Sequence, residues 1–126
     1  MTRLWKKVDK ILEDARKQVE DEVRKIAETI HRLKGEELRS LASRLGVKAY
    51  LTVVSHTDNP ILTMPALYVE PLNPSSYEDY QQKLTHAIEE LETAIGEWAS
   101  DYRLAIRGLP PHGNQNLENI IATYGG

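Results

Sequence analysis

A long amphipathic segment, from Arg3 to Lys34, constrains the fold more than any other feature of the chain. Its apolar residues recur at a mean spacing near 3.6, the period of a straight α-helix rather than of a sustained left-handed coiled coil. Lys, Arg, Asp and Glu stand between them, several in i,i+4 pairs such as Glu13–Lys17. The apolar positions are Leu4, Val8, Ile11, Ala15, Val19, Val23, Ile26, Ile30 and Leu33. A helix about 48 Å long with so narrow a stripe needs a long partner.

A second long helix is predicted over 76–108, from about Tyr77 to Arg107. The apolar residues from Leu84 to Leu109 follow one another at alternating steps of 4 and 3, a heptad pattern. Ile at the a positions and Leu at the d positions favour a helical partner, while flanking alanines widen the apolar face as in a helix bundle. We predict that this face is completed by another subunit. The interface candidates are Ile88, Leu91, Ile95, Trp98, Tyr102 and Ile106.

The segment between the two helices predicts a turn and a β-ribbon. Gly35 interrupts the first helix, so that 3–46 is expected to form a helical hairpin-like part, with a short helix over 36–45 capped by Gly46. The range 47–70 is rich in β-branched residues and predicts a two-stranded ribbon around the turn sequence HTDNP. Pro65 removes a backbone donor, so the second strand is expected to be an edge strand, bulged or broken.

The helix after the ribbon has a clear start signal. Ser75 and Ser76, with Glu78 and Asp79 three residues on, are overlapping capping-box candidates. At the other end, 115–124 is predicted to be a short helix or a docked tail. The fold class predicted for residues 1–126 is therefore a single, mainly α domain with a small β-ribbon (α+β). Its order is α-α-β-β-α-α, with two long antiparallel helices and short capping helices.

The composition excludes several kinds of site and membrane association. The 126 residues include no Cys, which excludes disulfides and cysteine nucleophiles. No apolar core of a signal peptide follows the basic start, and no apolar run reaches the length of a membrane span, so we predict no membrane partner. We expect the chain to lie in the cytoplasm or within an assembled particle.

Candidate catalytic and metal-binding patterns are weak. Ser55, His56 and Asp58 contain the residue types of a hydrolase triad, but neighbours on an extended chain point to opposite faces, and a turn tip is the simpler interpretation. His86 has the helical spacing of a metal pair with Glu89 or Glu90, yet it falls opposite the heptad seam. We therefore predict no catalytic residues, no metal site and no cofactor.

Nucleic acid is the weaker of the partner predictions. Residues 1–46 carry 12 Lys and Arg against 9 Asp and Glu, whereas 47–126 carry 4 against 10, so no concentrated basic surface is indicated. Ala42 and Gly46 have a spacing that resembles the first half of a helix-turn-helix, and that resemblance implies a recognition helix after Gly46. A β-prone segment follows instead.

Assembly is the function that the pattern favours. We predict a non-enzymatic structural or scaffold protein that acts through self-association as a homo-oligomer, in a virion or another large assembly. The first alternative is a small adaptor or regulator that binds another protein or nucleic acid, and the second is an enzyme of unknown class.

Overall fold

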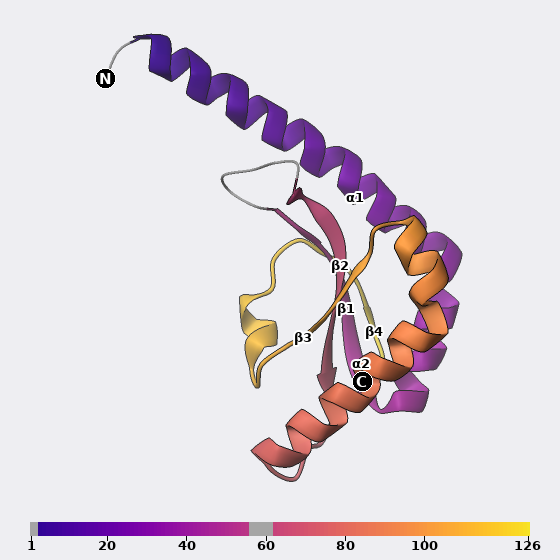
Figure 1. The fold of residues 1–126 in the computed structure, drawn as a ribbon. Coiled ribbons are helices and arrows are strands. Elements are labelled where there is room, and N and C mark those ends of the chain that lie inside the picture. The colour runs from indigo at the N-terminus through magenta and orange to yellow at the C-terminus, as the bar shows by residue number, and fades with distance from the viewer. Residues whose placement is uncertain (1–2, 56–61) are drawn as a thin grey trace.

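The computed structural model describes residues 3–55 and 62–126, and within them two α-helices pack on one mixed sheet of four strands (Figure 1). The elements are α1 (Arg3–Leu45), β1 (Val47–Val54), β2 (Met64–Pro71), α2 (Tyr77–Asp101), β3 (Ala105–Gly108), the 3-10 turn η2 (Gly113–Asn116) and β4 (Ile120–Tyr124). The chain is therefore of a mixed α+β class. The predicted order α-α-β-β-α-α and the predicted short helices are wrong.

Gly35 was predicted to interrupt the first helix, but α1 continues through it. Gly35 is buried inside the helix, and a Cβ atom built on it would lie 3.3 Å from His31 Nδ1 and 3.8 Å from Tyr124 Cε1. The tight contact would be with His31, whose ring binds Tyr124 of β4. Tertiary packing thus outweighs the weak helix propensity of glycine, and the predicted helix over 36–45 is the last part of α1. Gly46, with φ +67°, follows α1 in the left-handed conformation expected of a cap.

The sheet has the strand order β3-β2-β1-β4. β1 pairs antiparallel with β2 and with β4, and β2 pairs parallel with β3. The predicted ribbon over 47–70 is thus the centre of a larger sheet. Pro65 pairs with Val53 of β1 and lies just before Ala66, where pairing with β3 begins. The proline is tolerated because β2 is an interior strand only from Ala66 onward.

The helix predicted over 76–108 begins as expected and ends early. Ser76 is the N-cap of α2, and its Oγ accepts a hydrogen bond from the Asp79 backbone N–H at 3.1 Å. At the other end, Arg103 adopts a left-handed φ of 55°, and the N–H of the buried Leu104 donates to the Ala99 carbonyl at 2.8 Å. This arrangement is a Schellman cap with Arg in the place where glycine is usual. Residues 105–108, predicted as helix, form β3.

The C-terminal segment is also a strand rather than a helix. In the range 115–124, β4 occupies Ile120–Tyr124 and pairs with β1. Tyr124 is 1% exposed, and its hydroxyl lies 2.7 Å from His31 Nδ1. The β-branched pair Ile120 and Ile121 suits a strand, and the neighbouring edge of β1 provides the backbone partners.

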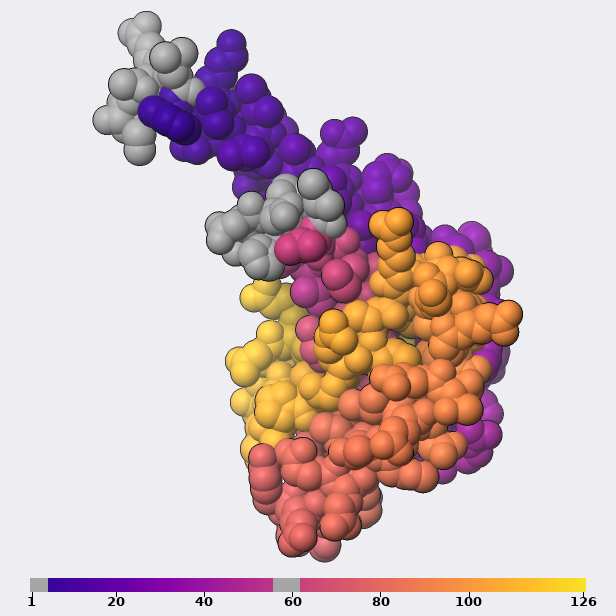
Figure 2. Space-filling model, in the orientation of Figure 1, coloured from indigo at the N-terminus to yellow at the C-terminus, as the bar shows by residue number. Residues whose placement is uncertain are grey.

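Both helices cover the same face of the sheet (Figure 1). α1 packs on β1 and β4 with its C-terminal half, and α2 packs on β2 and β3. The helices share one core with the sheet and do not form the predicted antiparallel pair. The largest fully buried side chains of this core include Ile30, Leu38, Leu51, Leu67, Leu91 and Ile95. Because the sheet is shorter than α1, the N-terminal half of this helix projects beyond it (Figures 1 and 2).

Neither helix, over the part of the chain that the structure describes, combines the length and the apolar composition needed to span a membrane.

Candidate self-association surface

The projecting half of α1 carries an unusual amount of exposed apolar surface. We call residues 5–22 the α1 extension. Trp5, Ile11 and Leu12 are 58%, 59% and 56% exposed. Farther along α1, Ile26 and Leu33 are also exposed. Among the described residues, α1 provides six of the nine large apolar side chains that are most exposed, although its C-terminal half lies on the core. An apolar concentration of this kind on one element indicates a binding surface.

Apart from Ile11, the exposed apolar residues of α1 follow a heptad spacing. We call this row of residues the α1 seam. Its steps alternate between 3 and 4 from residue 5 to residue 33, the spacing at which two helices pack side by side. The seam consists of Trp5, Val8, Leu12, Ala15, Val19, Glu22, Ile26, Thr29 and Leu33. Every seventh residue is large and apolar, and these residues are Trp5, Leu12, Val19, Ile26 and Leu33.

The α1 seam drifts around the helix relative to the face with which α1 binds the sheet. Trp5 and Leu12 stand 18 residues, five turns, before Val23 and Ile30 and share their side of the helix, whereas Ile26, Thr29 and Leu33 are turned away from it. Ala27 and Ile30 are fully buried in the core, and Val23 packs against it. Within the extension, the Ser55 hydroxyl donates a hydrogen bond of 2.5 Å to Glu20, which fixes the position of the helix relative to the end of β1. The seam is therefore accessible for two reasons: the sheet ends before Trp5 and Leu12, and the later seam residues turn away from the sheet.

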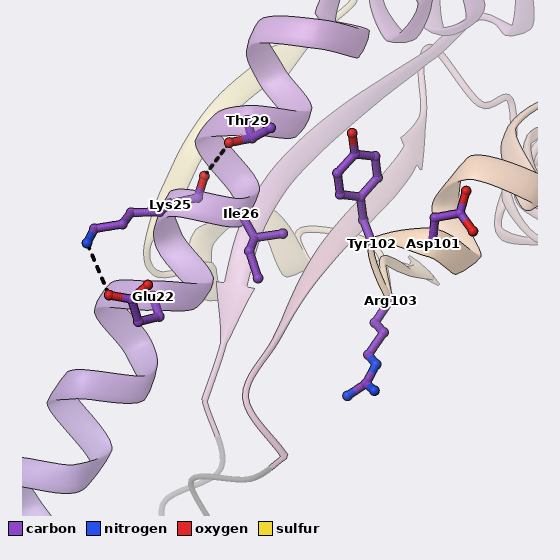
Figure 3. A pocket seen from close by; sticks show the side chains of 7 residues that line it. All are labelled: Glu22, Lys25, Ile26, Thr29, Asp101, Tyr102 and Arg103. Carbon is purple, nitrogen blue, oxygen red and sulfur yellow. Dashed lines mark hydrogen bonds and ion pairs between the residues drawn. The ribbon is translucent and has the colours of Figure 1, made fainter.

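The seam leads into a pocket between α1 and the turn after α2 (Figure 3). The pocket has a volume of about 430 Å³. α1 contributes one wall, with the seam residues Glu22, Ile26 and Thr29 next to Lys25. The other wall comes from the end of α2 and the turn that follows it, with Asp101, Tyr102 and Arg103. We call this cavity the α1–α2 pocket.

The side chains around the pocket combine an apolar floor with a charged rim. Figure 3 shows Ile26 pointing from α1 into the pocket, with the ring of Tyr102 on the opposite side. Lys25 Nζ forms an ion pair of 3.1 Å with Glu22, and Arg103 and Asp101 add one charge of each sign. An amphipathic aromatic side chain, with an apolar body and a polar tip, matches such a site.

Charged residues flank the seam along the extension. Arg16 forms an ion pair of 2.7 Å with Glu13 on the same helix. The hydrogen bond and the charge of Glu13 raise the pKa of Arg16, so its guanidinium is charged at any physiological pH. Asp9 lies one heptad before Arg16 on the same flank of the seam. The extension thus offers opposite charges at equivalent heptad positions.

Of the interface candidates predicted from 84–109, Ile88, Leu91, Ile95 and Trp98 lie on α2, Tyr102 is its C-cap and Ile106 lies in β3. Leu91 and Ile95 are buried in the core of the chain itself, at 2% and 0% exposure, and are not available to a partner in this structure. Ile88 is half-buried. Trp98, Tyr102 and Ile106 are half-buried and pack against the core. Tyr102 also lines the α1–α2 pocket, so it remains an interface candidate at the new surface.

The prediction from sequence did not include Trp5 and Leu12, two of the most exposed apolar residues of the extension. Neither was included in the stripe that was followed along α1, although each stands five turns before a stripe residue, Val23 and Ile30 respectively. The signal was the seven-residue recurrence of large apolar residues, which the stripe obscured because it joins core residues at one end of α1 to seam residues at the other.

The sequence also offered two other candidate sites, a hydrolase triad and a metal pair at His86. His56 and Asp58 of the hydrolase interpretation lie outside the described residues, as does the turn at 56–59. His86, Glu89 and Glu90 are exposed on α2. Across residues 3–55 and 62–126, no cluster of three or more His, Asp or Glu side chains has the arrangement of a metal site.

A polar pair occupies the sheet face opposite the helices. The Tyr50 hydroxyl donates a 2.5 Å hydrogen bond to Glu70, and Lys48 Nζ lies 5.6 Å from the centre of the Tyr50 ring. Burial, together with the bond to Glu70, raises the pKa of Tyr50 to about 12. The phenol is thereby held as a neutral donor, whereas a catalytic base or nucleophile needs the opposite shift.

Comparison of the chain with protein-family models, with curated proteins and with solved structures finds no match.

Proposed function

We propose that this chain is a non-enzymatic structural protein that works through self-association, and that the α1 seam of the extension is where two copies bind. The observation that carries the proposal is the row of exposed apolar residues, from Trp5 through Leu12, on a helix segment that projects from the folded body.

The energetics of an isolated helix support this proposal. The 18 residues of the extension would span about 27 Å, a length at which a helix without tertiary packing is marginal in water. Such a segment is stabilised chiefly by burying its apolar face. A partner that covers the seam would therefore supply the packing that the chain's own sheet supplies to the rest of α1.

A second copy of the same chain is the partner that the side chains favour. Asp9 and Arg16 lie on the same flank of the seam, seven residues apart. When two identical helices run antiparallel, residues on this flank face one another, so Asp9 of each copy can meet Arg16 of the other. Leu12 and Ala15 likewise place a large residue opposite a small one. The surface is complementary to itself in both charge and volume.

The mass of the full chain in solution tests the proposal. We expect a dimer or a larger oligomer by size-exclusion chromatography with light scattering, at concentrations in the tens of micromolar. Leu12→Glu should convert it to monomer because a carboxylate at the centre of the seam would be buried without a partner charge.

Lys17→Gln is the matched control. It changes the net charge by the same amount as Leu12→Glu, at an exposed position of α1 away from the seam. This variant should keep the mass of the wild type. A wild-type chain that is monomeric in this concentration range, or a Leu12→Glu variant that assembles normally, would contradict the proposal and favour a different protein as partner.

A further inference from the structure

We propose that two copies pair through antiparallel α1 extensions and that Trp5 of each copy fills the α1–α2 pocket of the other. This inference rests on the proposed function and specifies its geometry. The second copy then contributes the residue that completes a site on the first.

The α1 seam is continuous with the α1–α2 pocket. Glu22, Ile26 and Thr29 belong to the α1 seam and also line the pocket. A helix lying along the seam therefore passes directly over the pocket where α1 meets the turn after α2. Whatever covers the extension ends at this cavity.

The side chains that flank the seam favour an antiparallel partner helix. In a parallel, in-register pair, Trp5 would face Trp5 at the outer end, and the flanking pairs would join Ile11 to Arg16 and Gln18 to Val23, which are not complementary. An antiparallel pair forms two Asp9–Arg16 ion pairs instead. This direction also places the two folded bodies at opposite ends, so that both extensions are covered along their full length.

The Asp9–Arg16 pairs also set the register of the two α1 extensions. The alignment that brings Asp9 to Arg16 places Leu12 against Ala15 and Val8 against Val19 of the second copy. The same alignment places Trp5 against Glu22, the first pocket residue on α1. Helical side chains lean toward the N-terminus of their own helix. In an antiparallel partner, that direction leads from Glu22 toward Ile26, and thus into the pocket.

The lining of the α1–α2 pocket fits the indole ring of Trp5. An indole ring buries about 150–250 Å² of surface, and its N–H group requires an acceptor when buried. Ile26 and Tyr102 provide apolar and aromatic walls, and the carboxylates of Glu22 and Asp101 are acceptors at the rim. Lys25 and Arg103 are cations of the kind that stack over indole faces. Because a paired extension is short, two buried Trp5 side chains would add substantially to its stability.

The register is tested by disulfide formation, since the wild-type chain contains no Cys. Val8→Cys and Val19→Cys chains are mixed in equal amounts and oxidised gently. We expect cross-links between position 8 of one chain and position 19 of the other, identified by mass spectrometry. Cross-links mainly between identical positions would overturn the antiparallel register while leaving self-association intact.

The position of Trp5 is tested by its fluorescence in a Trp98→Phe background, where Trp5 is the remaining tryptophan. Emission should shift to shorter wavelengths as the chains associate. Thr29→Arg, which places a long side chain in the pocket, should reverse this shift and weaken association roughly 10- to 100-fold, as expected for a buried anchor residue. Trp5→Ala should weaken association by a similar factor.

These results separate the two proposals. A dimer whose Trp5 emission stays at long wavelength, and is unaffected by Thr29→Arg, overturns the pocket assignment alone. A chain that remains monomeric, with Trp5 exposed to water at every concentration, overturns the pocket assignment together with self-association.

Discussion

At the scale of single residues, glycines show how local propensity and tertiary contact compete. Gly108 was expected to end a helix, but it lies at the end of β3 against α2. A Cβ atom there would stand 2.7 Å from Leu84 Cδ2 and 3.2 Å from Ile88 Cδ1. Gly96 lies within α2, and a Cβ atom there would have no neighbour within 4 Å. A side chain at Gly108 would force Leu84 to shift, whereas Gly96 weakens its helix without a packing reason.

The two glycines predict opposite effects of the same substitution. Gly108→Ala should destabilise the chain by about 1–3 kcal/mol because the new methyl group overpacks the contact with α2. Gly96→Ala should stabilise it by about 0.5–1 kcal/mol, the gain in helix propensity. Urea denaturation of both variants measures the difference. Equal effects of the two substitutions would show that β3 does not pack on α2 as described.

At the scale of elements, α1 consists of two parts with different sources of stability. From Val23 onward the helix is held by the sheet, whereas most side chains of the extension are exposed. An element can be uniform in secondary structure and still be uneven in local stability, because hydrogen exchange depends on the packing around each turn.

This division predicts a concentration-dependent pattern of hydrogen exchange. In a monomeric Leu12→Glu variant, backbone amides of the extension should exchange far faster than those from Ala27 to Leu41, which lie on the core. In the assembled wild type, the extension should be protected. Lys17→Gln provides the reference at equal concentration. Strong protection of the extension in a verified monomer would indicate that its own chain covers it.

At the scale of the whole molecule, buried tyrosines link the stability of the fold to pH. Burial raises the pKa of Tyr124 on β4 to about 12, and burial followed by the bond to Glu70 does the same for Tyr50 on β1. Burial also raises the pKa of Tyr80 on α2. In each case the fold prefers the neutral phenol. Ionisation must therefore oppose folding at several points of the sheet and its covering helix.

The sign of the pH effect follows from these shifts. Because the folded pKa lies above the unfolded value of about 10, the contribution is complete below pH 10 and is lost as the pH rises toward about 12. Urea midpoints should therefore fall across this range. Tyr124→Phe should lower stability at neutral pH, through loss of the bond to His31, and should fall less steeply above pH 10. Tyr77→Phe, at a residue 68% exposed, should match the wild-type slope.

Local signals in the sequence were enough for several elements. The β-branched residues from Val47 predicted the first strand, and the Ser76–Asp79 spacing marked the start of α2. These features depend on interactions within a few residues, which the order of side chains specifies directly. The helical period of α1 was also legible, but its length was predicted wrongly, because the helix continues through Gly35 to Leu45.

Tertiary structure decided the features that depend on distant neighbours. Arg103 adopts a left-handed conformation that glycine usually takes, because Leu104 gains a buried position there and β2 offers an edge to β3. β4 forms because the free edge of β1 pairs with it and because Tyr124 is buried against α1, with its hydroxyl at His31. Each of these outcomes is a choice between two locally acceptable conformations that only a long-range contact distinguishes.

The candidate surface was hidden for the same reason. By itself, the sequence of α1 determined a long amphipathic helix with a core stripe and a heptad seam superimposed on it. Which apolar residues belong to the core was decided by the sheet, because it covers Ala27 and Ile30 and ends before the extension. Trp5 and Leu12 became recognisable as a binding surface only once the sheet was seen to end before them, since burial is a property of the packed molecule and not of the helix.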